Sequence, residues 1–265
     1  MLFFKSYLRA VNYMTAATLI VILTALWPQK EIMIPIFGTQ ISLLIQGEPD
    51  SEVLLYNMHD NENTSAIAGR AISGRYGGQY YELIHSGDRN IGFPYGVDSV
   101  WVDPNRIYTD AGVWQQLAKN KVTDTLVFET IVSWRDSLLS LLRIQDRSLV
   151  IALHNNTNKH YSVSSYTAGG EYEMEADTTY HGKAQDLDDF YFVTDTTIFN
   201  TLSKGRYHVV LQANETMTDD GSLSVYCARY GIPYINVEAQ HNHLIRQVRM
   251  LIFAYQELIL NNVKE

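Results

Sequence analysis

Residues 52–73, EVLLYNMHDNENTSAIAGRAIS, place an apolar strand, a polar turn and a helix in direct succession. The first part of this stretch, EVLLYNM, has the short apolar pattern of a buried strand. Asn63, Thr64 and Ser65 then precede small and apolar residues, which is typical of a helix N-terminus. A strand that leads through a short turn into a helix indicates an α/β fold.

The rest of the chain continues this alternation of strand-like and helix-like segments. Residues 32–45 predict a β-rich entry, and we expect buried strands at 148–153, 207–211 and 232–237. Apolar residues at three- and four-residue spacing predict an amphipathic helix at 125–144, and the last segment, 243–260, is also expected to be helical. We therefore expect a single α/β domain with a mixed, mainly parallel central sheet flanked by helices. In such sheets, functional residues gather at the carboxyl ends of the strands.

Composition narrows the class of protein further. The chain has 265 residues, of which 46% are hydrophobic and 18% charged, and its formal net charge is −9. These values exclude a mainly disordered chain and a polytopic membrane protein. The acidic balance argues against an electrostatic nucleic-acid binder. The one cysteine, Cys227, excludes an intramolecular disulfide and a Cys-rich zinc site, and its apolar surroundings predict a buried side chain.

The N-terminal segment has the pattern of an export signal. Residues 10–29 are uncharged and largely apolar, and they follow two basic residues, Lys5 and Arg9. A cleaved signal peptide and a membrane anchor fit residues 1–29 about equally, and a buried core helix is the alternative. We expect the remaining domain, residues 30–265, to be exported, either periplasmic or tethered to the membrane through residues 10–29.

Two of the predicted strands end in side chains that suit a zinc ion. His59 and Glu62 follow the strand at 52–58, three residues apart in a turn, and His154 ends the strand at 148–153. Imidazole nitrogen and carboxylate oxygen are ligands that zinc accepts at catalytic sites. Each motif alone is weak, because an HxxE sequence is most often a surface turn and a histidine at a strand end is most often simply hydrogen-bonded.

Two further motifs add a cation and a carboxylate. Asn105 and Arg106 lie in the loop DPNR, and a guanidinium can bind a carboxylate through two parallel hydrogen bonds. Glu238 follows the strand at 232–237 and is therefore expected at the same sheet edge. Taken singly, Arg106 is more typical of a surface salt bridge, and Glu238 could cap the helix that follows.

The order of these four motifs resembles that of the zinc carboxypeptidase superfamily, including its aspartoacylase and succinylglutamate desuccinylase branch. The motifs are HDNE at 59–62, NR at 105–106, LHNNT at 153–157 and VE at 237–238, and the resemblance covers roughly residues 50–245. The sequence departs from the family in its YNM lead-in to HDNE, which is glycine-rich in the family, and in the residues after Glu238. These departures indicate a divergent branch.

The resemblance implies a role for each residue of the motifs. His59, Glu62 and His154 would hold one Zn²⁺ ion. Glu238 would be the general base that takes a proton from the attacking water and passes it to the leaving amine. Zinc would lower the pKa of that water towards about 7 and polarise the scissile carbonyl.

The resemblance also implies residues that contact the substrate. Asn105 and Arg106 would anchor a substrate carboxylate. Family members stabilise the oxyanion with an arginine upstream of the Asn-Arg pair, and Arg89 is the best-spaced candidate for a catalytic role of this kind. That match is one of position only, and an ordinary surface arginine is an equal alternative.

Other polar clusters have plainer interpretations. His241 and His243 follow the last predicted strand and are expected to line a rim or cap the final helix rather than bind the ion. Asp186, Asp188 and Asp189 form an acidic cluster. Calcium binding is one interpretation of this cluster, and a solvated loop is the commoner one.

We therefore expect an exported zinc metallohydrolase that cleaves an amide bond adjacent to a free carboxylate, such as a carboxypeptidase acting on peptidoglycan stem peptides. An N-acyl amino acid deacylase of the desuccinylase or aspartoacylase kind is the alternative among enzymes. A non-catalytic envelope protein that binds ligands on the same fold is the alternative from another class. The expected partner is a peptide or N-acyl amino acid substrate, not a nucleic acid.

Overall fold

A computed structural model describes residues 28–184 and 186–260 of the chain. The predicted signal or anchor falls on residues 1–29, of which 1–27 lie outside the described part. Within the described ranges, no helix combines the length and the apolar character that crossing a bilayer requires.

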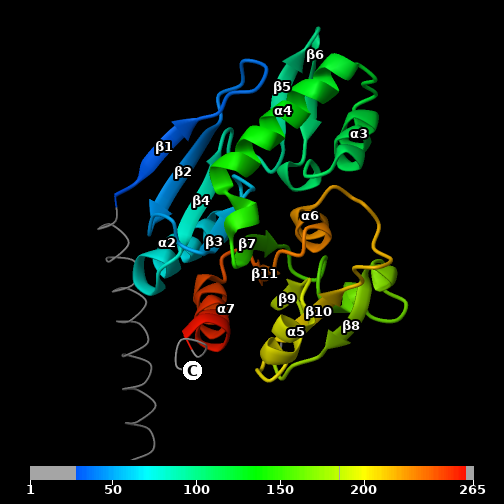
Figure 1. The fold of residues 1–265 in the computed structure, drawn as a ribbon. Helices are drawn as coiled ribbons and strands as arrows, with labels where there is room; N and C mark the ends of the chain where they lie inside the picture. Colours follow the sequence, from blue (N-terminus) through cyan, green and yellow to red (C-terminus); the bar gives the residue numbers. More distant parts are fainter. Residues whose placement is uncertain (1–27, 185, 261–265) are drawn as a thin grey trace, which may run out of the picture.

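Nine strands of the described chain form one central sheet (Figure 1). Its four inner strands run parallel to one another, and the outer strands add both antiparallel and parallel pairs. The predicted α/β fold with a mixed sheet, parallel at its centre, is confirmed. In spatial order the strands are β1 (Lys30–Met33), β2 (Ser42–Gly47), β4 (Gln79–Ile84), β3 (Val53–Asn57), β7 (Leu149–Asn156), β11 (Tyr234–Gln240), β9 (Phe190–Val193), β10 (His208–Gln212) and β8 (Ala176–Tyr180).

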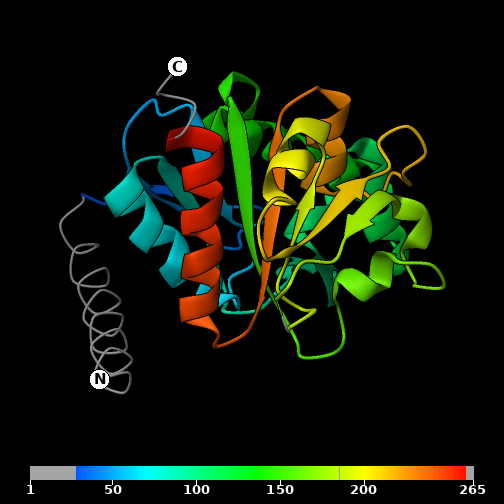
Figure 2. The same cartoon turned by 90° about the horizontal axis from the view of Figure 1, so that it is seen from below.

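Helices cover both faces of the sheet. One face carries α2 (Asn63–Tyr76), α5 (Thr196–Leu202) and α7 (Leu244–Tyr255), and Figure 2 shows α2 and α7 side by side on it. The other face carries α3 (Asp110–Lys119), α4 (Thr125–Leu142) and α6 (Leu223–Arg229), together with a hairpin of β5 (Ile91–Tyr95) and β6 (Asp98–Val102). Short helical turns complete the described chain at Pro104–Arg106, Ile144–Asp146, Val163–Tyr166, Glu173–Glu175 and Gln256–Leu260.

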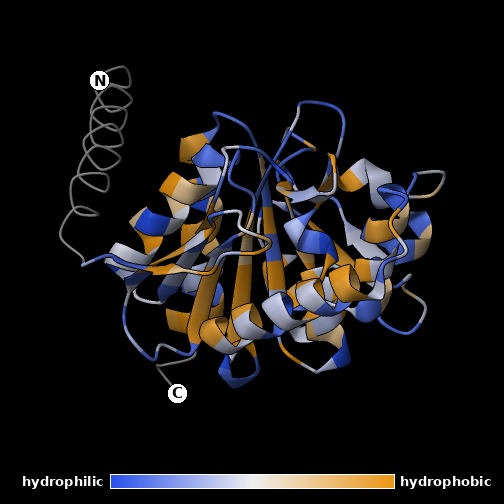
Figure 3. Cartoon of the chain, turned by 90° about the horizontal axis from the view of Figure 1, so that it is seen from above, coloured by the Kyte–Doolittle hydropathy of each residue, from blue (hydrophilic) through white to orange (hydrophobic). Residues whose placement is uncertain are grey.

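The inner strands are mostly apolar because both of their faces are buried. In β3, Leu54 and Tyr56 face one hydrophobic core, and Val53 and Leu55 face the other. Side chains alternate between the two faces of a strand, so a strand covered on both sides reads as a continuous apolar run. Figure 3 shows these apolar strands between the two helical layers.

The strand–turn–helix unit at residues 52–73 is held tightly against the sheet. The predicted helix begins at Asn63 as expected, and the N–H of Ser65 in its first turn donates to Asn155 Oδ1 at 2.9 Å. A Cβ atom at Gly69 would lie 2.4 Å from Leu153 Cδ1, so only glycine allows α2 to approach β7 this closely. The turn that carries His59 and Glu62 is therefore fixed at both ends.

Candidate metal centre

His59, Glu62 and His154 converge at the carboxyl ends of β3 and β7. His59 Nδ1 lies 3.0 Å from Glu62 Oε1 and 3.1 Å from His154 Nδ1, and His154 Nδ1 lies 3.1 Å from Glu62 Oε2. All three side chains are buried. They meet because β3 and β7 are parallel neighbours, so their carboxyl ends lie at one edge of the sheet.

The second ring nitrogen of His59 is held by Asp103. His59 Nε2 lies 2.9 Å from Asp103 Oδ1, and because an ionised carboxylate only accepts, Nε2 must donate the hydrogen. In the neutral imidazole, the lone pair of Nδ1 then faces Glu62 and His154. Burial alone would lower the pKa of His59, but Glu62 and Asp103 raise it above its ordinary value. A lone pair and a carboxylate that face one point favour a cation, and this donor set suits zinc.

Glu62 is prepared as an anionic ligand. Its Oε1 accepts from Arg89 Nη1 at 2.7 Å, and its Oε2 accepts from the N–H of Asn155 at 3.1 Å. Burial alone would raise the pKa of Glu62, but His59 and His154 hold it well below its ordinary value. The carboxylate of Glu62 is therefore ionised at neutral pH.

Arg89 lies beside the His59–Glu62–His154 triad. The loop that carries it is fastened by Asp60, whose Oδ2 accepts from the N–H groups of His85 and Gly87, both at 2.7 Å. Arg89 Nε lies 3.5 Å from Asp103 Oδ2, in addition to the contact with Glu62. The arginine chosen by position in the sequence thus has its guanidinium between two carboxylates of the centre.

Glu238 stands opposite His154 in the register of β11 and β7. Residues opposite each other on neighbouring strands point to the same face, and strands are about 4.8 Å apart, so the two side chains are neighbours. The carboxylate accepts from Asn236 Nδ2 at 3.0 Å and from Asn156 Nδ2 at 3.4 Å. Burial raises the pKa of Glu238, and a cation in the triad would lower it again.

A cavity with a volume of about 710 Å³ opens beside the His59–Glu62–His154 triad, and Arg106 and Asn105 line it together with Glu62 and His154. Arg106 Nε is 3.4 Å from Asp220 Oδ2. Asn105 Oδ1 accepts from the N–H of Leu223 at 3.0 Å, so the amide nitrogen is the end that a ligand would meet. The predicted site residues that line this cavity are Glu62, Arg89, Asn105, Arg106, His154 and Glu238, and its aromatic wall consists of Tyr161, Tyr166, Tyr172, Phe192 and Tyr234.

His243 belongs to a different cluster. Its Nδ1 lies 3.9 Å from Asp186 Oδ2, and it forms a group with Asp186 and Asp189. Arg246 Nε lies 2.9 Å from Asp189 Oδ2, so a guanidinium already neutralises this carboxylate. In the part of the chain that the structure describes, neither His243 nor His241 joins the triad.

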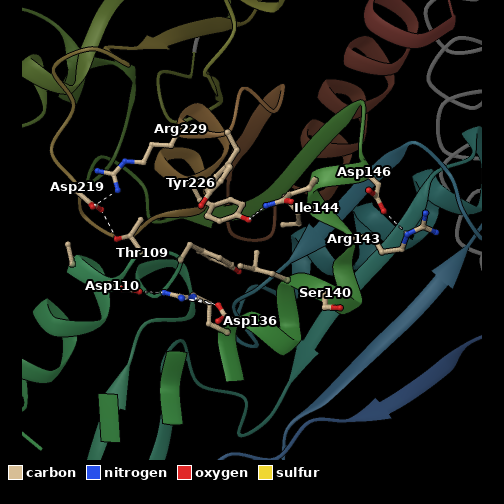
Figure 4. Close-up of a pocket in the computed structure, with 16 residues that line it drawn as sticks. Thr109, Asp110, Asp136, Ser140, Arg143, Ile144, Asp146, Asp219, Tyr226 and Arg229 are labelled. Carbon is tan, nitrogen blue, oxygen red and sulfur yellow. Dashed lines mark hydrogen bonds and ion pairs between the residues drawn. The ribbon is translucent and has the colours of Figure 1, made fainter. Parts of the chain in front are cut away.

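A second cleft of about 890 Å³ lies on the other side of the loop at residues 213–222 (Figure 4). Its arginines are engaged by carboxylates: Arg135 pairs with Asp110 at 2.8 Å, and Arg229 pairs with Asp219 at 2.6 Å. Among the described residues that line this cleft, none is a predicted site residue.

Sequence reasoning missed Asp103, although it stands in the DPNR motif. A signal existed, because a metal-binding histidine almost always donates its other ring N–H to a carboxylate, a carbonyl or water. The amide pair of Asn156 and Asn236 was also missed. Both amides follow from the alternation of side chains along β7 and β11, since they share a face with His154 and Glu238.

Several solved structures have a fold similar to that of this chain. They include an aspartoacylase family protein from Mesorhizobium loti (12% identity, TM-score 0.42, 88% of this chain and 68% of that chain). They also include a tripeptide-bound cell shape determinant protein from Helicobacter pylori (12%, 0.47, 84% and 55%) and thrombin activatable fibrinolysis inhibitor (9%, 0.49, 94% and 77%).

These likenesses are distant. No protein-family model and no curated protein matches the sequence. An aspartoacylase family protein, of the kind that the sequence motifs resemble, is among these similar structures. At these identities and TM-scores, the activity of a similar protein cannot be assigned to this chain, and its function must be inferred from its own site.

Replacing Asp103 by Asn should weaken zinc binding by about 10- to 100-fold, because the amide cannot accept from His59 Nε2 with the strength of a carboxylate. The Asn side chain still caps the turn at Pro104–Arg106 by accepting from the N–H of Asn105, so the fold is preserved. Competition with a chelator of known affinity measures the effect. Asp88→Asn, in the exposed loop before Arg89, is the control, and equal losses in both variants would contradict this role of Asp103.

Replacing Gly221 by Ala should destabilise the protein through a contact with Arg106. Gly221 has a φ of +79°, and a Cβ atom there would lie 2.4 Å from the carbonyl oxygen of Arg106. Gly231 has a φ of +65°, but a Cβ atom there would meet no described atom within 4 Å. Gly231→Ala should therefore cost only the backbone term of about 1–2 kcal/mol. Gly221→Ala should cost about 1–3 kcal/mol more in urea unfolding, and equal costs would show that the contact relaxes freely.

Proposed function

We propose that this protein is a zinc-dependent hydrolase that cleaves an amide bond next to a free carboxylate. One observation supports it most: His59 Nδ1, His154 Nδ1 and the Glu62 carboxylate face one point at the edge of a cavity that Glu62, His154, Glu238 and Arg106 line. A ligand set, a buried carboxylate and a cation in one cavity are the groups that such a reaction needs.

The donor set fits a catalytic zinc site. Two imidazoles and one carboxylate leave one position for water or substrate, as in other catalytic zinc sites. When bound, zinc would act as a Lewis acid on the scissile carbonyl and would make the attacking water more acidic. Asp103 and the N–H of Asn155 would keep His59 and Glu62 in their ligating orientations.

Glu238 is suited to move the proton. It is buried beside His154, and the amides of Asn236 and Asn156 hold both of its oxygens. It would accept a proton from the attacking water and then donate that proton to the leaving nitrogen. Arg89, next to the triad, would donate to the oxyanion that develops on the carbonyl.

Arg106 and Asn105 select the substrate in this proposal. A guanidinium and an amide N–H₂ on one wall of the cavity can together bind a carboxylate. The carboxylate would fix the scissile amide at a set distance from Glu238. A chain with a terminal carboxylate and an N-acyl amino acid both meet this requirement.

Peptides with a free C-terminus are the preferred substrates, and stem peptides of peptidoglycan are the preferred natural source. The apolar stretch at residues 10–29 supports an exported location, where such peptides occur. N-acyl amino acids are the competing class, since they present the same amide and carboxylate.

Hydrolysis by the zinc-loaded protein tests the proposal. A panel of short peptides, peptides with an amidated C-terminus, N-acetylaspartate and N-succinylglutamate should show zinc-dependent release of amine from one carboxylate-bearing class. A chelator should abolish this release, and added zinc should restore it. A protein that binds zinc but cleaves no member of the panel would favour a binding role on the same fold.

A further inference from the structure

The loop at residues 213–222 lies between two hollows. One is the 710 Å³ cavity that Glu62, His154 and Glu238 line, called the catalytic cavity below, and the other is the second cleft. The loop joins β10 to α6, and its Met217, Thr218 and Asp220 line the catalytic cavity. Its Asp219 points the other way, into the second cleft, where Figure 4 shows it beside Thr109 and Arg229. Neighbouring residues of one loop thus contact two different cavities.

Asp219 ties this loop to the elements on the side of the second cleft. Its Oδ1 accepts from Thr109 Oγ1 at 2.7 Å and from the N–H of Gly221 at 3.2 Å. Its Oδ2 pairs with Arg229 Nη1 at 2.6 Å, and its carbonyl oxygen accepts from Gln115 Nε2 at 2.8 Å. Burial alone would raise the pKa of Asp219, but Thr109 and Arg229 lower it below its ordinary value. The carboxylate therefore joins the loop to α3 and to α6.

The opposite side of the loop touches Arg106 with both side chain and backbone. Asp220 Oδ2 lies 3.4 Å from Arg106 Nε. The N–H of Tyr108 donates to the carbonyl of Gly221 at 2.9 Å, and Gly221 packs so closely on the carbonyl of Arg106 that no Cβ fits between them. The position of this loop thus sets the surroundings of the guanidinium.

We propose that Asp219 is a positioning residue, which holds the loop at residues 213–222 so that Asp220 orients Arg106 for a substrate carboxylate. This inference rests on the proposed function for the role of Arg106, but it assigns a residue outside the catalytic cavity. It acts through Asp220 and does not itself contact substrate. Loss of the Asp219 contacts lets the loop shift, and the guanidinium then has several orientations, of which one binds the carboxylate.

The zinc-loaded Asp219→Ala variant tests this role. We compare substrates with a free carboxylate and with an amidated terminus in the wild type and the variant. KM for the carboxylate substrate should rise about tenfold while kcat stays within about twofold, because only binding of the carboxylate is lost. The amidated substrate does not use Arg106, so its kinetics should stay unchanged. The preference for a carboxylate should therefore fall about tenfold.

Two controls separate positioning from general stability. Asp136 lies in the second cleft and pairs with Arg135 on α4, away from the loop. Asp136→Ala should therefore leave the preference for a carboxylate substrate unchanged. Thr109→Val removes the hydroxyl donor to Asp219 and should reproduce part of the loss. Thr109→Ser keeps that hydroxyl and should keep the wild-type preference for a carboxylate substrate. Equal losses for both substrates, or no loss in Asp219→Ala, would overturn the proposal.

Calorimetric binding keeps this test independent of hydrolysis. The zinc-loaded wild type should bind N-acetylalanine more tightly than its amide, and Asp219→Ala should reduce that difference about tenfold. If the wild type shows this difference and Asp219→Ala reduces it, but the wild type cleaves no member of the substrate panel, the proposed activity is refuted and the positioning role is supported. A wild type that shows no difference would overturn the positioning role.

Discussion

Replacing Glu238 by Gln should lower kcat by about 10³-fold, within the 10²–10⁴ range of general acid–base catalysis, while leaving zinc bound. The amide has nearly the shape of the carboxylate and still accepts from Asn236 or Asn156, so the cavity keeps its form. It has no basic oxygen to accept a proton from water. Steady-state kinetics with metal analysis of the same sample measures both quantities.

Glu175→Gln is the matched control for this variant. Glu175 also lines the catalytic cavity, but its carboxylate accepts from the N–H of Thr218 at 2.9 Å, away from the triad. It should retain nearly all of the wild-type kcat. Full activity in Glu238→Gln, or an equal loss in Glu175→Gln, would contradict the role of Glu238 as base.

Replacing His154 by Ala should abolish zinc binding and with it all hydrolysis. Only Glu62 and His59 would remain, and two ligands hold zinc far more weakly than three. In the wild type, zinc should raise the midpoint of thermal unfolding, because a ligand that binds only the folded state stabilises it. The His154→Ala variant should show no such rise and a zinc content near zero by elemental analysis.

His160→Ala controls for the loss of an imidazole from the same cavity. His160 lines the cavity but is not part of the converging triad. Its variant should keep about one zinc per chain and the thermal shift, since it removes no ligand. If His154→Ala still bound zinc with unchanged affinity, the triad would not be the metal centre.

The α/β fold class could be predicted from the sequence, because the inner strands have apolar patterns typical of buried strands. The runs around Leu54 and Ile151 are apolar on both faces, and the helix after Glu62 has polar starting residues. The order of strands could not be predicted. It depends on contacts between distant segments, such as the pairing of β11 with both β7 and β9, that no local pattern contains.

The candidate site was predictable where it follows strand ends. His154 and Glu238 stand at the ends of adjacent parallel strands, and such ends meet at one edge of the sheet. Asp219 was not predictable, because its importance comes from Thr109 and Arg229, which lie on separate helical elements. The export signal stays a prediction, since residues 1–27 of the segment 1–29 lie outside the part of the chain that the structure describes.

A crystal structure of the zinc-loaded protein, with anomalous data at the zinc edge, tests the central claim most directly. The triad places two imidazole Nδ1 atoms and a carboxylate around one point. We predict one zinc ion there, within about 2.0–2.2 Å of His59 Nδ1, His154 Nδ1 and a Glu62 oxygen. Zinc bound only elsewhere, such as beside Asp186 and His243, or no anomalous peak at the triad, would contradict it.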